Sequence, residues 1–203
     1  MRSYLVGFRA CWSMSATTFI LGFVVLPGSA PRFSGPVGGE ANTTEILATR
    51  EQTGGAFGVW RYTSPSGGGP PVHIHRAEDE FFYVLSGAFN FQLGDCIKSA
   101  PAGSFVFIPK DEVHTFQHVG PEPGVLLGGV TPGGFEGLFQ DLPGADTAAV
   151  QALFKKHHMD VVGPPQEATA RAQRPTPPGA AAADQDPTDR CARARLSATL
   201  DRA

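Results

Sequence analysis

Three histidines and one glutamate in the middle of the chain have the residue types and the spacing of a metal site. His73 and His75 are separated by a single residue, Glu80 follows shortly afterwards, and His114 lies further along the chain. Successive side chains of a β-strand point to opposite faces, so residues two apart share a face. His73 and His75 therefore present both imidazoles on one side of a predicted strand.

The other two residues can reach the same point from neighbouring strands. Glu80 opens the next predicted strand, on the same face as Phe82 and Val84, and a tight turn can bring its carboxylate beside the imidazoles. His114 begins a strand after a turn at Pro109. Three imidazoles and one carboxylate suit one divalent transition metal ion, and Fe, Mn, Ni, Co, Cu and Zn all remain open because affinity order alone does not choose among them.

The elements that must position these side chains are short strands separated by Gly- and Pro-rich turns. Many short strands at this spacing are typical of a sandwich or barrel, and no internal repeat is visible, so we expect a single barrel. The predicted strands are Phe57 to Tyr62, Val72 to His75, Glu80 to Leu85, Ala88 to Leu93, Ser104 to Ile108, Thr115 to Val119 and Gly124 to Val130.

Beyond the strands, residues 135–142 and 146–157 are predicted to be helical, with Asp146 capping the second helix. His157 and His158 fall at its end, where a structural role is expected, as it is for His118. The pair Val161 and Val162 with the following Gly and prolines is expected to end the ordered part. Residues 166–203 contain few large apolar side chains, so we expect a disordered tail.

The N-terminus has two interpretations. Residues 1–18 are expected to be an extension, and the domain is expected to span residues 19–165. Val24 to Leu26 is interpreted as the first strand, with a turn at Pro27 and Gly28, which favours a cytoplasmic protein. Alternatively, residues 1–30 are a secretory signal with a cleavage site of small residues. The apolar run is too short to span a membrane.

Composition excludes some partners. The net charge of -3 and the absence of a basic stripe argue against nucleic acid. Cys11, Cys96 and Cys191 are far apart and odd in number, so a disulfide framework is not expected and a reducing compartment is the simpler interpretation.

The wider spacing resembles the two sequence motifs of the cupin superfamily. The motifs are Gly67-x5-His73-x-His75-x4-Glu80-x6-Gly87 and Gly94-x6-Pro101-x-Gly103-x5-Pro109-x4-His114. All four metal positions of the family match, and the second motif has one extra residue between its glycine and proline. The resemblance implies an RmlC-like jelly-roll β-barrel with short C-terminal helices. Across about residues 20–165 the chain also resembles bacterial single-domain cupins of the quercetin 2,3-dioxygenase type.

That resemblance implies an enzyme, a metal-dependent dioxygenase acting on a flat phenolic or enolic substrate with O2. Glu80 would be both a metal ligand and a catalytic base; a purely structural ligand is the alternative. Glu78 and Asp79 are expected to form a solvated acidic turn, with Glu78 as the ligand in a slipped register as the minor alternative. Core packing is the default for each strand aromatic, and the candidates for the substrate pocket are Phe82, Phe116, Trp60 and Tyr62.

Two further classes of function stay open. One is a non-oxidative metalloenzyme, such as an isomerase, cyclase or decarboxylase, in which the ion acts as a Lewis acid. The other is a non-catalytic barrel that binds a small ligand, because fold does not set function. The resemblance also implies a homodimer, formed by pairing or exchange of edge strands.

Overall fold

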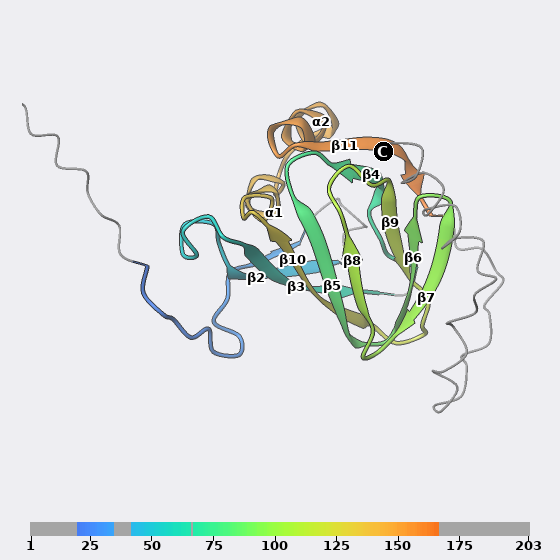
Figure 1. The fold of residues 1–203 in the computed structure, drawn as a ribbon, viewed down its shortest axis with the longest axis horizontal. Coiled ribbons are helices and arrows are strands. Elements are labelled where there is room, and N and C mark those ends of the chain that lie inside the picture. The colour runs from blue at the N-terminus through green and yellow to red at the C-terminus, as the bar shows by residue number, and fades with distance from the viewer. Residues whose placement is uncertain (1–19, 35–41, 66, 167–203) are drawn as a thin grey trace, which may run out of the picture.

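The structure is a computed structural model that describes residues 20–34, 42–65 and 67–166. These residues form two antiparallel sheets that face each other as a barrel (Figure 1). In spatial order, the first sheet contains β1 (Arg32–Ser34), β2 (Thr43–Ala48), β3 (Gly58–Ser64), β10 (Gly124–Thr131), β5 (Asp79–Ser86) and β8 (Phe105–Ile108). The second contains β11 (Met159–Pro165), β4 (Pro71–His75), β9 (His114–His118), β6 (Ala88–Leu93) and β7 (Cys96–Pro101).

The predicted strands are all present, as β3, β4, β5, β6, β8, β9 and β10. Strands that are distant in sequence lie side by side, as β10 does between β3 and β5. Two antiparallel sheets joined by such connections are the jelly-roll arrangement. The prediction of an all-β jelly-roll barrel with short C-terminal helices is therefore confirmed.

Alternation along β5 shows how the sequence pattern becomes a barrel wall. Glu80, Phe82 and Val84 are buried, whereas Tyr83 and Leu85 between and after them are exposed. The same alternation in β3 turns Trp60 and Tyr62 inward, a direction that the sequence pattern alone left open.

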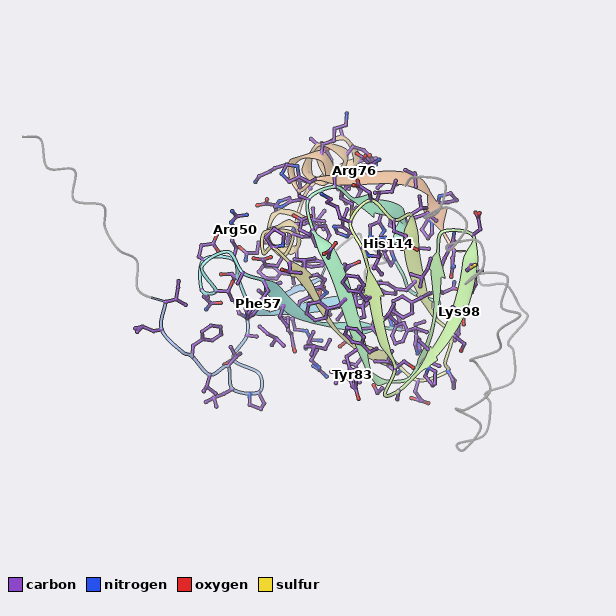
Figure 2. The ribbon with its side chains drawn as sticks, viewed as in Figure 1. Arg50, Phe57, Arg76, Tyr83, Lys98 and His114 are labelled. Carbon is purple, nitrogen blue, oxygen red and sulfur yellow. The ribbon has the colours of Figure 1, made fainter. Side chains whose placement is uncertain are left out.

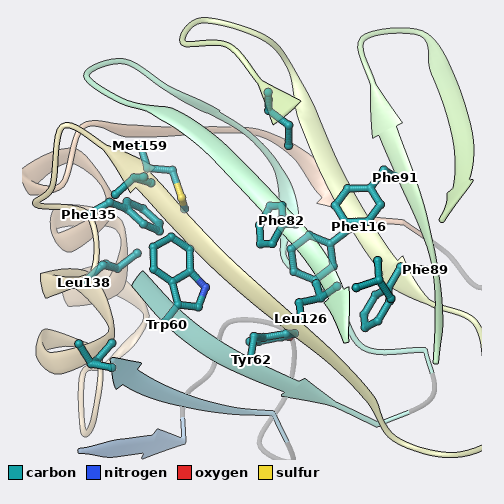
Figure 3. Close-up of a cluster of buried hydrophobic side chains, with 14 of the residues drawn as sticks. Trp60, Tyr62, Phe82, Phe89, Phe91, Phe116, Leu126, Phe135, Leu138 and Met159 are labelled. Atoms are coloured by element: carbon teal, nitrogen blue, oxygen red, sulfur yellow. The ribbon is translucent and has the colours of Figure 1, made fainter. Parts of the chain in front are cut away.

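The buried side chains form one aromatic-rich core between the sheets (Figure 3). Phe82 lies near its centre, with ring centroids 5.1 Å from Phe116, 5.5 Å from Phe91 and 6.5 Å from Trp60. Edge-to-face and tilted arrangements dominate these contacts, as expected for aromatic rings. The core members are Ile46, Trp60, Tyr62, Phe82, Val84, Phe89, Phe91, Ala100, Ile108, Phe116, Leu126, Val130, Phe135, Leu138, Leu142, Phe154 and Met159.

Four strands were not predicted, for identifiable reasons. No strand is predicted at Cys96–Pro101 (β7), which contains the polar residues Lys98 and Ser99, yet it pairs along its whole length with β6. The strand β2 is mixed in polarity, and β1 is only three residues long. Met159–Pro165 (β11) continues past the expected end of the ordered part and pairs with β4 despite its Gly and prolines.

The predicted strand at Val24 to Leu26 is wrong. These residues have no strand partner in the described part of the chain, and Val24 is 84% exposed. The turn that was expected after them is present, since the backbone N–H of Ser29 donates to the carbonyl of Leu26 at 3.0 Å. The predictions for residues 1–18 and for most of the tail fall outside the described residues, although Gln166, at the start of that tail, hydrogen-bonds to Gln117 and Gln92.

Both predicted helices form, as α1 (Gly137–Asp141) and α2 (Thr147–Lys156). Asp146 caps α2 as expected, because its side chain accepts a hydrogen bond from the backbone N–H of Ala149 at 2.8 Å. Phe154 of α2 is buried in the core. The two helices lie beside one end of the barrel, and β11 crosses that end (Figure 1). None of the helices in the described ranges has the length and apolar character needed to cross a membrane.

One cysteine departs from the sequence-based expectation. Cys96, at the start of β7, is disulfide-bonded. The expectation of a chain without disulfides is therefore wrong at this residue, and the cysteine pattern no longer supports a reducing compartment.

Candidate metal centre

The two sheets bring the four sequence-predicted residues to one point inside the barrel. β4 carries His73 and His75 on its inner face, and His114 of the neighbouring β9 is directly opposite His73 in the strand register. Glu80 reaches the same point from β5 in the other sheet. Figure 2 shows the labelled His114 in the interior between the sheets. The site is therefore held by strands on both sides of the barrel.

The four side chains are close enough to share one ion. One ligand atom from each of His73, His75, Glu80 and His114 lies within 4.8 Å of the others. Glu80 Oε2 lies 2.9 Å from His114 Nε2 and 3.7 Å from His75 Nε2. All four residues are at most 4% exposed. The prediction that these residues form one cluster is confirmed at the level of geometry.

Two of the imidazoles are oriented by backbone carbonyls. His73 Nδ1 lies 2.7 Å from the carbonyl oxygen of Pro71, and His114 Nδ1 lies 2.8 Å from that of Glu112. A carbonyl only accepts hydrogen bonds, so each Nδ1 carries the proton and donates it. The Nε2 atom of each ring is thereby directed toward the cluster, which is how a metal-binding histidine is fixed in its tautomer.

Burial and charge shift the pKa values of two of the histidines in opposite directions. Burial lowers the pKa of His73 well below its ordinary value, and the neighbouring rings of His114 and His75 lower it further. Burial also acts to lower the pKa of His114, but the hydrogen bond to Glu80 and its charge outweigh this and raise it. The buried Glu80–His114 contact thus pairs a carboxylate with an imidazole that holds a proton readily.

The donor set fits a divalent transition ion. Three imidazole nitrogens and one carboxylate oxygen are borderline ligands that suit Fe, Mn, Co, Ni, Cu or Zn. The Nε2 atom of His75 is buried and has no hydrogen-bond partner among the described residues. Because this nitrogen lies 3.7 Å from Glu80 Oε2 inside the cluster, it is placed to act as a ligand, whereas His118, whose buried ring nitrogens also lack a hydrogen-bond partner in the described part of the chain, lies outside the cluster.

The predicted pocket residues are all buried in the core. Phe82 and Phe116 extend the inner faces of the strands that carry Glu80 and His114, and Trp60 and Tyr62 belong to the same core. That they line a substrate pocket stays a prediction. Of the other strand aromatics, Phe91 also belongs to the core, whereas Phe57, Phe105 and Phe107 are exposed.

One wall of the site was missed in the sequence. The ring of Phe135 lies 4.2 Å from that of His75 in an edge-to-face arrangement, and it also contacts Trp60. Phe135 was interpreted only as the start of a helix. Its position just before α1, far from the metal motifs in sequence, gave no signal of this contact.

The expectation for Glu78 is wrong. It was expected in a solvated turn, but it is only 5% exposed, and its Oε2 lies 3.8 Å from His75 Nδ1. Asp79 does point outward, where its carboxylate accepts a hydrogen bond from the backbone N–H of Lys110. The slipped-register alternative is not supported, since the cluster of ligand atoms contains Glu80 and not Glu78.

The three remaining histidines, His118, His157 and His158, lie outside the cluster. His118 is fully buried with its ring 5.0 Å from that of Phe89. His157 ends α2 and donates a hydrogen bond from Nε2 to Asp141 at 2.7 Å. Both placements agree with the structural roles expected for these residues.

Comparison with known families bears on this site. Residues 60–128 match the family model described as the cupin domain, a stretch that contains His73, His75, Glu80 and His114. Together with the jelly-roll topology, this match supports the cupin superfamily, and the fold is a cupin-type β-barrel. Among curated proteins, none matches this sequence.

Solved structures with similar folds include several cupins. The polyketide cyclase RemF from Streptomyces resistomycificus has 17% identity, a TM-score of 0.49, and coverage of 64% of this chain and 92% of that chain. An RmlC-like cupin from Shewanella frigidimarina has 20% identity, a TM-score of 0.47, and coverage of 55% and 92%. A predicted oxalate decarboxylase from Thermotoga maritima has 22% identity, a TM-score of 0.46, and coverage of 54% and 99%. These values carry no argument about activity, so the fold assignment rests on the strand order and the family match.

Proposed function

We propose that the protein is a metal-dependent enzyme, and specifically an oxygenase acting on a flat phenolic or enolic substrate, as quercetin 2,3-dioxygenases do. The observation that carries the proposal is the convergence of His73, His75, His114 and Glu80 on one buried point. A divalent ion bound there would act as a Lewis acid toward a substrate oxygen. The activity on a flavonol and the use of O2 rest on the sequence resemblance.

Glu80 is the proposed base. Its Oε2 is 2.9 Å from His114 Nε2, so the carboxylate sits among the donors where a substrate hydroxyl would approach. A base must lie within hydrogen-bond reach of the proton that it takes. Glu80 would accept the proton of the enol or phenol, while His114, whose Nδ1 donates to the carbonyl of Glu112, would use Nε2 to hold the ion.

The surroundings favour an apolar, flat substrate. Phe135 lies against His75, and Phe82 and Phe116 extend the inner faces beyond Glu80 and His114. Aromatic side chains exclude water and offer faces on which a planar ring can stack. These residues would hold the substrate and keep the site dry.

The same donor set also suits a non-oxidative reaction, because Lewis-acid activation does not require O2. An isomerase, cyclase or decarboxylase is therefore the second candidate. The two differ in one measurable way, since only the oxygenase loses its activity under strict anaerobiosis.

The test starts from the metal content of protein purified without added ions, which should show one equivalent of a transition metal. Protein loaded in turn with Fe, Mn, Co or Ni is then incubated with quercetin in air, and the flavonol absorbance is followed. Loss of absorbance that requires O2 and is abolished in Glu80→Gln supports the oxygenase. No loss with any of these metals would sink the flavonol proposal, and ligand binding without turnover, unaffected by Glu80→Gln, would favour a binding protein.

The assembly of the protein and its cellular location are also proposals. A homodimer remains the proposed assembly, and sedimentation of the purified chain tests it. For location, a disulfide at Cys96 is more typical of an oxidising compartment, so it favours the secreted alternative over the cytoplasmic one. Fractionation of cells that express the full chain separates the two.

A further inference from the structure

The three cluster histidines are not oriented in the same way. His73 and His114 each donate from Nδ1 to a backbone carbonyl, at 2.7 and 2.8 Å. His75 Nδ1 has no hydrogen-bond partner among the described residues. Oε2 of Glu78 lies 3.8 Å from this nitrogen, and it likewise lacks a hydrogen-bond partner within the described ranges.

The burial of Glu78 is unusual for a carboxylate in a turn. Only 5% of the residue is exposed, and charged groups are rarely buried without a partner. Leaving a buried polar group without a hydrogen-bond partner is destabilising, more so when the group is charged. Two such groups facing each other are best explained if they are partners in the working state of the site.

The turn that carries Glu78 is held from outside. Arg76 donates to Asp160 at 2.7 Å and to Asp111 at 3.0 Å. Asp79 accepts from the backbone N–H of Lys110 at 2.8 Å. Because the residues on either side are fixed to the surface, the Glu78 side chain between them is directed inward, toward His75.

We infer that Glu78 is a positioning residue for His75. Its carboxylate accepts a hydrogen bond from the protonated Nδ1 of His75, which keeps Nε2 unprotonated and directed at the cluster, the role that backbone carbonyls have for the other two histidines. The separation of 3.8 Å exceeds hydrogen-bond distance, so this role requires the Glu78 carboxylate to move closer to Nδ1 in the working site. A carboxylate also makes the imidazole a more basic ligand than a carbonyl does.

This inference rests on the proposed metal site, and its consequences are measurable without a substrate. Partners of this kind, when removed, typically lower metal affinity about 10- to 100-fold. We expect Glu78→Ala to weaken Co2+ binding by that factor while leaving the stoichiometry at one. Glu78→Gln keeps the shape and an acceptor oxygen but not the charge, so its loss should be smaller.

Asp79→Asn is the matched control, since it removes the same charge from the adjacent residue on the outward side. Co2+ affinity is measured by competition with a chelator for the wild type and all three variants. A second measurement is the long-range nitrogen–proton NMR spectrum of the Zn2+-loaded protein, in which His75 should show a protonated Nδ1 that exchanges faster in Glu78→Ala. The isosteric Glu78→Gln provides a folded variant if Glu78→Ala does not fold.

The outcomes separate the two proposals. If the wild type binds no metal, the proposed function fails. If the wild type binds metal and both Glu78 variants retain its affinity and the His75 signal, the inference is overturned. Equal weakening in Asp79→Asn would also overturn it, because the effect would then follow net charge and not the contact with His75.

Discussion

Strand β9 allows metal binding to be separated from packing, because it carries two buried histidines of which one belongs to the cluster. His114 is 1% exposed and lies 2.9 Å from Glu80, whereas His118 is fully buried against Phe89. Replacing either with alanine removes a buried imidazole from the same strand. We therefore expect His114→Ala and His118→Ala to lower stability in metal-free protein, but only His114→Ala to abolish the response to metal.

The size of that response follows from linkage. A ligand that binds only the folded state at a free concentration of 100 times its Kd stabilises that state by about 2.7 kcal/mol. In a chain of this size, each kcal/mol raises Tm by about 2–4 °C. The wild type should thus gain about 5–11 °C on saturation with metal. His118→Ala should show the same rise from a lower starting Tm, and His114→Ala should show little or none.

The assay is thermal unfolding followed by circular dichroism, first after treatment with a chelator and then with added Zn2+ or Mn2+. Titration of the metal at the midpoint temperature of each protein's own unfolding transition distinguishes weaker binding from absent binding. A full metal-dependent rise in His114→Ala would refute the assignment of this residue as a ligand. Loss of the rise in His118→Ala would show that packing of β9, and not ligation, governs the response.

Three further predictions concern stability and are checked by urea unfolding. Lys156 donates a hydrogen bond to Asp141 and lowers the pKa of that carboxyl. The pair therefore stabilises the fold above the unfolded pKa of Asp, and this stabilisation is lost as pH falls through the lower folded pKa. Asp141→Asn should lower the free energy of unfolding by about 0.5 kcal/mol near neutral pH and by nothing in strong acid. Phe82→Ala should cost about 3–5 kcal/mol because it leaves a cavity in the aromatic core. Gly128→Ala should cost about 1–3 kcal/mol by overpacking, since its Cβ would lie 2.6 Å from Nε1 of Trp60; a neutral result for either core variant would contradict the packing described.

The metal cluster was predictable because its geometry is local and periodic. His73 and His75 share a face by strand alternation alone, and Glu80 follows after one turn. His114 required the second motif, since its place opposite His73 depends on how β4 and β9 pair. Where the spacing of residues within a strand sets the geometry, the sequence was sufficient.

The failures share a different cause, which is dependence on tertiary contacts. Glu78 looked solvated because it lies in an acidic turn, yet contacts of Arg76 with two aspartates distant in sequence hold that turn against the barrel. The segment that forms β7 has no strand pattern in its sequence because its polarity is mixed, but pairing with β6 makes it a strand. Burial supplied by partners far along the chain leaves no periodic signal in the segment itself.

The wall of the candidate site also depends on tertiary contacts, and this has a consequence for the substrate of the proposed enzyme. The family match ends at residue 128 and includes all four cluster residues. Phe135 lies beyond it and contacts His75, while β11 pairs with β4 so that Met159 is opposite His75 and Val161 opposite His73. The donors therefore come from the stretch that matches the family, whereas part of their surroundings comes from the segment after it. Because the donor set is compatible with several reactions, we expect the choice of substrate to depend on this C-terminal segment more than on the four donors.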